Sequence, residues 1–162
     1  MPRRRRRVAP ELKSTMSELA ARSAAPPAVL VEPVAAWCRR RPVELCVLFG
    51  SRATGGDRPD SDVDLAVWVE GRKASAEERL AWHRELTRLL GLPVQVVVVG
   101  PRLDPVLGLQ IARQGRVLHA TRDNVWPHER LRLWHLYQDS RPFLAAARHR
   151  MRRFAEEPHH GA

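Results

Sequence analysis

Two short stretches decide the fold of this chain: LFGSRATGG at residues 48–56 and DSDVDL at residues 60–65. The apolar run Val43–Phe49 leads into the first stretch and is rich in β-branched and aliphatic residues, which predicts a strand. The second stretch begins polar and then alternates, which predicts another strand over 60–69. The turn between them is too short for a helical crossover, so we expect the two strands to be antiparallel.

Apolar residues at helical spacing predict helices around this strand pair, and two further apolar runs predict strands. Helices are expected over 28–41, which contains Pro33, over 75–91, over 104–114 and over 124–157; strands are expected over 93–99 and 116–119. Ser75 and Glu78 have the spacing of a capping box, and Pro142 should break or kink the last helix. The predicted fold class is α+β: a small mixed β-sheet flanked by helices, with a C-terminal helical segment.

A chain of 162 residues with 44% hydrophobic residues suits one domain with tails, which we place at 28–157. Residues 1–27 are basic and expected to be flexible, with one short helix possible around 12–22, and 158–162 are expected to be a disordered tail. The formal net charge is +10, and Arg3–Arg7 contribute to it. That run either contacts nucleic acid or an acidic partner, or is a solvated tail; direct nucleic-acid binding is the less favoured of these readings.

The two cysteines, Cys38 and Cys46, each lie among apolar neighbours, which favours reduced core thiols over a disulfide. The chain has no apolar run long enough to span a membrane, and no apolar stretch follows its basic start as in a secretory signal. We therefore expect a cytoplasmic protein that is not attached to a membrane.

A pair of carboxylates opens the second predicted strand. Because side chains alternate along a strand, Asp62 and Asp64 should share one face, while Val63, Leu65 and Val67 point into the core. Adjacent carboxylates repel each other unless a cation lies between them, and oxygen ligands beside substrate phosphates are what Mg²⁺ prefers. The pair is therefore a candidate magnesium site.

The bend after the first predicted strand supplies groups that suit phosphate. Gly50 lets the backbone approach a ligand closely, and Ser51 offers a hydroxyl. Arg52 could add positive charge on a triphosphate. These three residues are the candidate nucleotide-binding group.

The order Gly-Ser, ten residues, Asp-x-Asp resembles the signature of the DNA polymerase β-like nucleotidyltransferase superfamily. The wording at 48–53 and 61–65 is most similar to its minimal nucleotidyltransferase (MNT) branch, over about residues 28–119, and 137–143 resembles the C-terminal helix of that branch. The resemblance implies a nucleotidyltransferase fold in which Asp62 and Asp64 are the catalytic, metal-binding carboxylates. It further implies Mg²⁺-dependent transfer of AMP from ATP to a protein hydroxyl of a HEPN-type toxin, with this chain as the antitoxin.

One position departs from the pattern that the resemblance implies. The family has a third carboxylate on the next strand, and here the corresponding residue is Gln95. A glutamine oxygen can ligate Mg²⁺ but carries no charge, so chemistry that depends on a second metal should be slowed by orders of magnitude. Asp104, the next carboxylate along the chain, has the context of a helix cap rather than of a replacement ligand.

Two other functions remain open at this point. A weakened site favours an MNT-fold antitoxin that neutralises its toxin by binding alone. A small-molecule (antibiotic) nucleotidyltransferase would keep the chemistry, but the chain has little room for an acceptor domain, and its charge would repel a polycationic drug.

Trp126, Trp134 and Tyr137 lie at helical spacing and are expected to pack in a core or an interface.

Overall fold

The computed structural model describes residues 26–56 and 58–156. The expectations for the basic run Arg3–Arg7, for a short helix at 12–22 and for the tail 158–162 lie outside these residues. The described chain contains the helices α2 (Ala28–Arg39), α3 (Ser51–Thr54), α4 (Ala76–Leu90), α5 (Pro105–Gln114) and α6 (Val125–Glu156), and the strands β1 (Val43–Phe49), β2 (Val63–Val69), β3 (Val94–Val98) and β4 (Arg116–Ala120). No helix in these ranges combines the length and the apolarity that crossing a bilayer requires.

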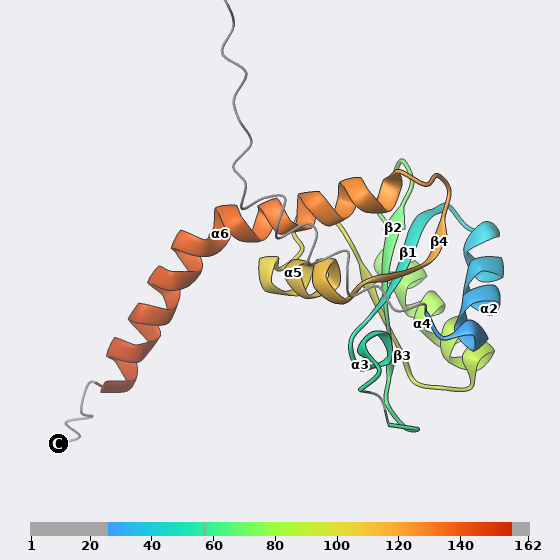
Figure 1. The fold of residues 1–162 in the computed structure, drawn as a ribbon, viewed down its shortest axis with the longest axis horizontal. Coiled ribbons are helices and arrows are strands. Elements are labelled where there is room, and N and C mark those ends of the chain that lie inside the picture. The colour runs from blue at the N-terminus through green and yellow to red at the C-terminus, as the bar shows by residue number, and fades with distance from the viewer. Residues whose placement is uncertain (1–25, 57, 157–162) are drawn as a thin grey trace, which may run out of the picture.

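The four strands form one sheet in the order β3-β2-β1-β4 (Figure 1). β1 pairs antiparallel with both β2 and β4, while β2 and β3 run parallel, joined through α4. The sheet is therefore mixed, and the first two strands are antiparallel, both as predicted. The predicted α+β class is confirmed.

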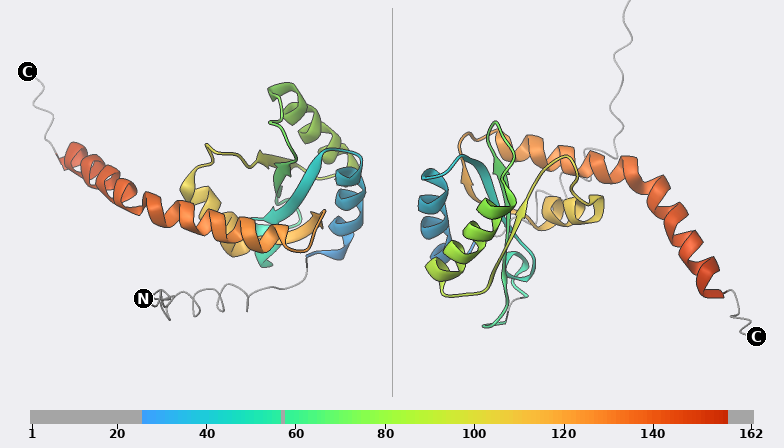
Figure 2. Two further views of the ribbon diagram at one scale, coloured as in Figure 1. Left: turned by 90° about the horizontal axis from the view of Figure 1, so that it is seen from above. Right: turned by 180° about the vertical axis from the view of Figure 1, so that it is seen from behind.

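Helices cover both faces of the sheet, as the view from above in Figure 2 shows. The first core lies between the sheet and helices α2 and α4, and the second core lies between the sheet and helices α5 and α6. Strand alternation assigns the side chains of β2 to these cores: Val63, Leu65 and Val67 belong to the first, as predicted, and Ala66 and Trp68 to the second.

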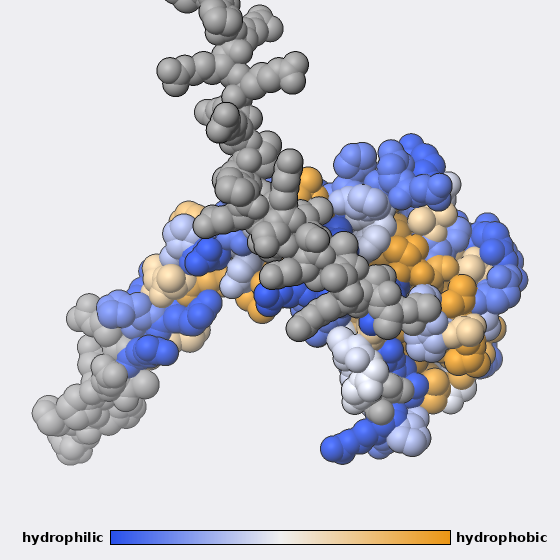
Figure 3. Space-filling view, in the orientation of Figure 1, coloured by the Kyte–Doolittle hydropathy of each residue, from blue (hydrophilic) through white to orange (hydrophobic). Residues whose placement is uncertain are grey.

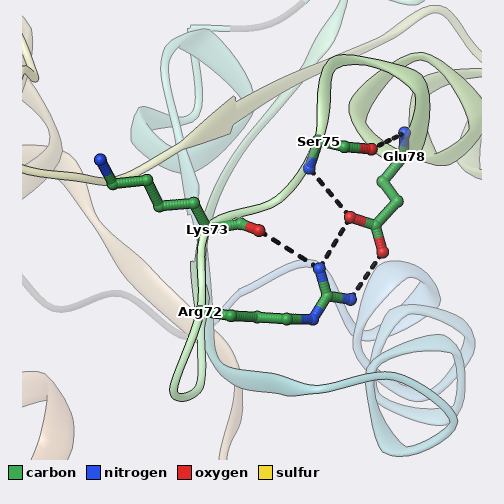
Figure 4. Close-up of polar contacts among 4 residues, drawn as sticks. All are labelled: Arg72, Lys73, Ser75 and Glu78. Atoms are coloured by element: carbon green, nitrogen blue, oxygen red, sulfur yellow. Dashed lines mark hydrogen bonds and ion pairs between the residues drawn. The ribbon is translucent and has the colours of Figure 1, made fainter.

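Both predicted helix caps are present. The Ser75 hydroxyl accepts from the Glu78 N–H at 3.1 Å, and the Glu78 carboxylate accepts from the Ser75 N–H at 2.9 Å, which completes the capping box of α4 (Figure 4). The Asp104 carboxylate accepts from the N–H groups of Val106 and Leu107, each at 2.9 Å, and so caps α5.

The start of strand β2 differs from the sequence prediction, whereas helix α2 starts at Ala28 as predicted. Strand β2 begins at Val63 rather than at residue 60, because residues 58–61 form a turn in which the Arg58 N–H donates to the Ser61 hydroxyl. Helix α2 begins at Ala28 and continues through Pro33, although proline supplies no N–H to the helix. The buried side chains of Leu30 and Trp37, on either side of that proline, pack into the first core and hold the helix together.

Helix α6 is continuous but bends along its length, so the proline prediction is confirmed as a kink and not as a break (Figure 1). Pro142 cannot donate to the helix ladder, and two residues earlier the Ser140 hydroxyl donates to the Leu136 carbonyl at 2.7 Å. The first half of α6 packs on α5 and the sheet, where the Trp68 indole donates to Glu129 at 2.6 Å. The second half projects away from the sheet.

Of the aromatic residues in the first half of α6, Trp126 packs against the second core, as predicted. Trp126 meets Trp68 edge to face, with ring centroids 6.2 Å apart, and Trp134 and Tyr137 are half-buried.

In the first core both cysteines are buried free thiols. A hydrogen bond with Cys38, together with burial, raises the pKa of Cys46.

Candidate functional site

The site begins at the bend between β1 and α3. Gly50 has φ +76° and ψ −159°, a conformation that side-chain-bearing residues rarely adopt. A Cβ added at Gly50 would lie 2.2 Å from Oδ2 of Asp64, so the carboxylate of Asp64 rests directly against the backbone of the bend. Pairing of β1 with β2 brings the two residues together, because Phe49 and Asp64 are partners across the strands.

The second part of the site lies where β2 and β3 run side by side. Asp64 and Gln95 are partners in the parallel register, and the Gln95 Nε2 donates to Oδ2 of Asp62 at 3.2 Å. Asp62 lies one residue before β2, and by alternation it shares the face of Asp64. The structure therefore brings Asp62, Asp64 and Gln95 together beside the Gly50 bend.

The electrostatics of the carboxylate pair favour a bound cation. Partial burial, and secondly the charge of Asp62, raise the pKa of Asp64, because both disfavour its ionised form. A divalent cation between the two carboxylates would remove that penalty. The missing Cβ of Gly50 is what lets the Asp64 carboxylate lie against the bend. Within the described ranges no three His, Cys, Asp or Glu side chains come together as a metal cage. The residues present thus fit one Mg²⁺ held by two carboxylates, with water or phosphate completing its shell.

The guanidinium of Arg52, in α3, hydrogen-bonds to backbone carbonyls. Its Nε donates to the Ser61 carbonyl at 2.8 Å, and a terminal nitrogen donates to the Pro59 carbonyl at 3.1 Å. These bonds fasten the segment immediately before Asp62 to α3, so Arg52 positions that carboxylate. The contact of Arg52 with phosphate remains a prediction, and Ser51 lies half-buried at the start of α3.

Sequence reasoning missed a residue that contacts the bend. The Gln114 Oε1, at the end of α5, accepts from the Gly50 N–H at 3.1 Å. Gly115 makes this approach possible, since a Cβ at Gly115 would lie 2.7 Å from Val47 Cγ1. The neighbouring Arg116 donates from Nε to the Ala53 carbonyl and supports α3 from β4. No motif marks Gln114, because its position depends on how α5 packs against β1.

Comparison with known proteins agrees with this geometry. The model of the polymerase beta nucleotidyltransferase family matches residues 34–124, which is more than half of the chain and includes the whole site. The chain therefore belongs to the polymerase beta nucleotidyltransferase family. No curated protein matches the sequence.

Several solved structures share the fold. A chain of the crystal structure of a toxin–antitoxin with AMP-PNP has a TM-score of 0.66 and 22% identity, over 75% of this chain and 98% of that one. A chain of the toxin–antitoxin MntA–HepT has a TM-score of 0.60 and 21% identity, over 74% of this chain and 95% of that one. A chain of a mutant of the same pair has a TM-score of 0.59 and 18% identity, over 86% of this chain and 97% of that one. At these identities the likeness establishes the arrangement of helices and strands.

Proposed function

We propose that this chain is a Mg²⁺-dependent nucleotidyltransferase of the MNT type, which transfers AMP from ATP to a hydroxyl of a HEPN-type toxin in the cytoplasm and so acts as an antitoxin. The observation that carries the proposal is the position of the Asp64 carboxylate against the Gly50 bend, with Asp62 beside it. Family membership supports the class of reaction. Structures of the same fold described as toxin–antitoxin, one of them with AMP-PNP, support the setting.

In this proposal Asp62 and Asp64 hold the Mg²⁺, which neutralises charge on the phosphates when it is bound. The Gly50 N–H and the Ser51 hydroxyl orient the triphosphate at the bend, while Arg52 keeps Asp62 in place through its bonds to the carbonyls of Pro59 and Ser61. The acceptor hydroxyl gives up its proton to water and forms a bond to the α-phosphorus, and the bond to the departing pyrophosphate breaks. Catalysis rests on positioning and charge complementarity.

The projecting second half of α6 is suited to contact with a partner protein. This half exposes two large apolar side chains, Phe143 and Met151, which are 77% and 73% accessible. Figure 3 shows hydrophobic residues interspersed with hydrophilic ones along it. Exposed apolar side chains on a projecting helix are typical of a surface that contacts another protein.

One observation favours a second candidate, an antitoxin that acts by binding alone. Gln95 stands where the family resemblance calls for a carboxylate, and its amide nitrogen hydrogen-bonds to Asp62. The amide adds no negative charge for a second metal, and it uses one acceptor position of a proposed metal ligand. Under this candidate the fold and the partner surface are kept while transfer is lost.

One experiment separates these functions. The chain is incubated with ATP labelled at the α-phosphate, Mg²⁺ and a HEPN-type toxin encoded beside it, and the toxin is analysed for AMP by mass spectrometry. We expect label on the toxin, its loss in Asp64→Asn, and its retention in Asp60→Asn, an exposed aspartate of the preceding turn.

Label that appears only with Gln95→Asp would indicate a weakened site of the proposed kind. If neither protein transfers label but the two copurify, the binding antitoxin is the correct function. If the two proteins neither react nor bind, both candidates fail.

A further inference from the structure

The backbone N–H of Gly50 already has a partner in the free protein. Gly50 is buried, and a buried N–H without an acceptor is strongly unfavourable. The Oε1 of Gln114 supplies the acceptor at 3.1 Å, and the same oxygen accepts from Gln110 Nε2 at 3.4 Å. The side chain of a helix residue 64 positions away along the chain therefore covers the donor that the bend would present to phosphate.

We propose that Gln114 is a competitive latch on the phosphate-binding bend: its amide oxygen holds the Gly50 N–H until a nucleoside triphosphate displaces it. This proposal rests on the proposed function, since it assumes that phosphate binds at Gly50. An amide oxygen and a phosphate oxygen are both acceptors, and one N–H directed at a single position cannot donate fully to both. Gln114 therefore lowers the affinity of the site for phosphate and does not contribute to it.

The geometry allows the latch to open without rearrangement of the fold. Only the side chain of Gln114 has to turn, because Gly115 fixes the end of α5 against β1 through its contact with Val47. Gln114 is half-buried, so its amide can reach solvent once it is displaced. A charged phosphate forms a stronger hydrogen bond than a neutral amide, so the ligand prevails when its concentration is sufficient.

The latch predicts an effect opposite to that of an ordinary binding residue. Removal of the amide should tighten nucleotide binding, because the N–H no longer has to exchange one protein acceptor for another. Net contributions of single neutral hydrogen bonds correspond to a gain of about two- to tenfold in affinity. If Gln114 instead helped to hold the triphosphate, its removal would weaken binding.

The test is calorimetric titration of the full chain with Mg²⁺ and a non-hydrolysable ATP analogue. The variants are Gln114→Ala and Gln114→Met, of which the second keeps the length of the side chain without the amide. Gln138→Ala is the control, because Gln138 lies on α6 and accepts from Arg141 away from the bend. Exchange of the Gly50 amide proton, followed by NMR, reports the latch directly and without nucleotide.

We expect both Gln114 variants to bind the analogue about two- to tenfold more tightly than the wild type, and the Gly50 amide to exchange faster in both. Unchanged or weaker binding in Gln114→Ala, with the wild type binding normally, overturns the latch and leaves the proposed function standing. Tighter binding in Gln114→Ala but not in Gln114→Met also overturns it, because space and not the hydrogen bond would then be responsible. If neither the wild type nor Gln114→Ala binds the analogue, both proposals are overturned.

Discussion

The carboxylate of Asp64 touches the backbone of Gly50, and a Cβ at residue 50 would lie 2.2 Å from Asp64 Oδ2. Two strands that are neighbours both in sequence and in the sheet create this contact. The bend and the carboxylate are therefore one structural unit, and a change in either residue should displace the other.

Gly50→Ala should disturb the site more than the backbone conformation alone would explain. The substitution meets both an unfavourable φ of +76° and the carboxylate of Asp64, so we expect a loss of about 2–4 kcal/mol in the free energy of unfolding. Urea denaturation measures it. The matched comparison is Gly50→Ala made in Asp64→Ala, which removes the carboxylate and keeps the backbone conformation of Gly50. If Gly50→Ala costs as much in Asp64→Ala as in the wild type, the contact with Asp64 is contradicted.

Gln95→Asp should make the stability of the protein depend on Mg²⁺. The substitution replaces a donor to Asp62 by a like charge at an exposed position, so without metal we expect a loss of about 0.5–1.5 kcal/mol. Because a third carboxylate strengthens the cation site, Mg²⁺ should raise the Tm of this variant more than that of the wild type. Thermal unfolding with and without Mg²⁺ measures both effects. Gln95→Ala removes the same bond without adding charge and should not gain the Mg²⁺ response.

The start of α4 should lose stability in acid. The guanidinium of Arg72, bonded to Glu78 at 2.6 and 2.8 Å, together with the Ser75 N–H, lowers the pKa of Glu78 from 4.5 to about 2 (Figure 4). A carboxylate whose pKa falls on folding stabilises the fold above its unfolded pKa, and this contribution is lost as the pH falls from 4.5 toward 2.

We therefore expect the wild type to exceed Glu78→Gln in urea midpoint at pH 6, and the difference to shrink steadily below pH 4.5. Glu77→Gln serves for comparison, because Glu77 belongs to the same helical turn but not to the capping box. A difference between the wild type and Glu78→Gln that stays constant from pH 6 to pH 3 would refute the assignment.

Glu129 should tie α6 to the sheet mainly through Trp68. The Trp68 indole is 6% exposed and donates to Glu129 at 2.6 Å, so Glu129→Ala leaves a nearly buried donor without its acceptor. We expect a loss of about 1–3 kcal/mol in urea denaturation. Glu129→Gln keeps an acceptor for the indole and should lose less. Equal losses would point instead to the ion pair of Glu129 with Arg132.

The sequence predicted the parts of the fold that depend on local periodicity. Alternation placed Val63, Leu65 and Val67 in a core, and the short connection between β1 and β2 required them to be antiparallel. The predicted start of β2 was wrong, because the hydrogen bonds of Arg52 that hold the preceding turn form only in the folded structure. Element ends depend on such contacts more than element centres do.

The candidate site could be predicted in part for the same reason. Gly50 directly follows β1, and Asp62 and Asp64 lie at the start of β2, so the pairing of these two strands brings the residues of the motif close together. Gln114 arrives from α5, and its approach depends on the fit of Gly115 against Val47. A fit of this kind leaves no periodic or motif signal in a single sequence.

The sheet keeps the proposed chemistry and one of the two cores on opposite sides. Asp64 shares its face with the second core, whereas the first core, under α2 and α4, contributes no side chain to the site. A library of substitutions that seeks greater heat resistance can therefore sample helices α2 and α4, while α3, whose Ala53 reaches the first core, and helices α5 and α6 should be left unchanged. Variants selected in this way should gain thermal stability without a change at the carboxylates or the bend.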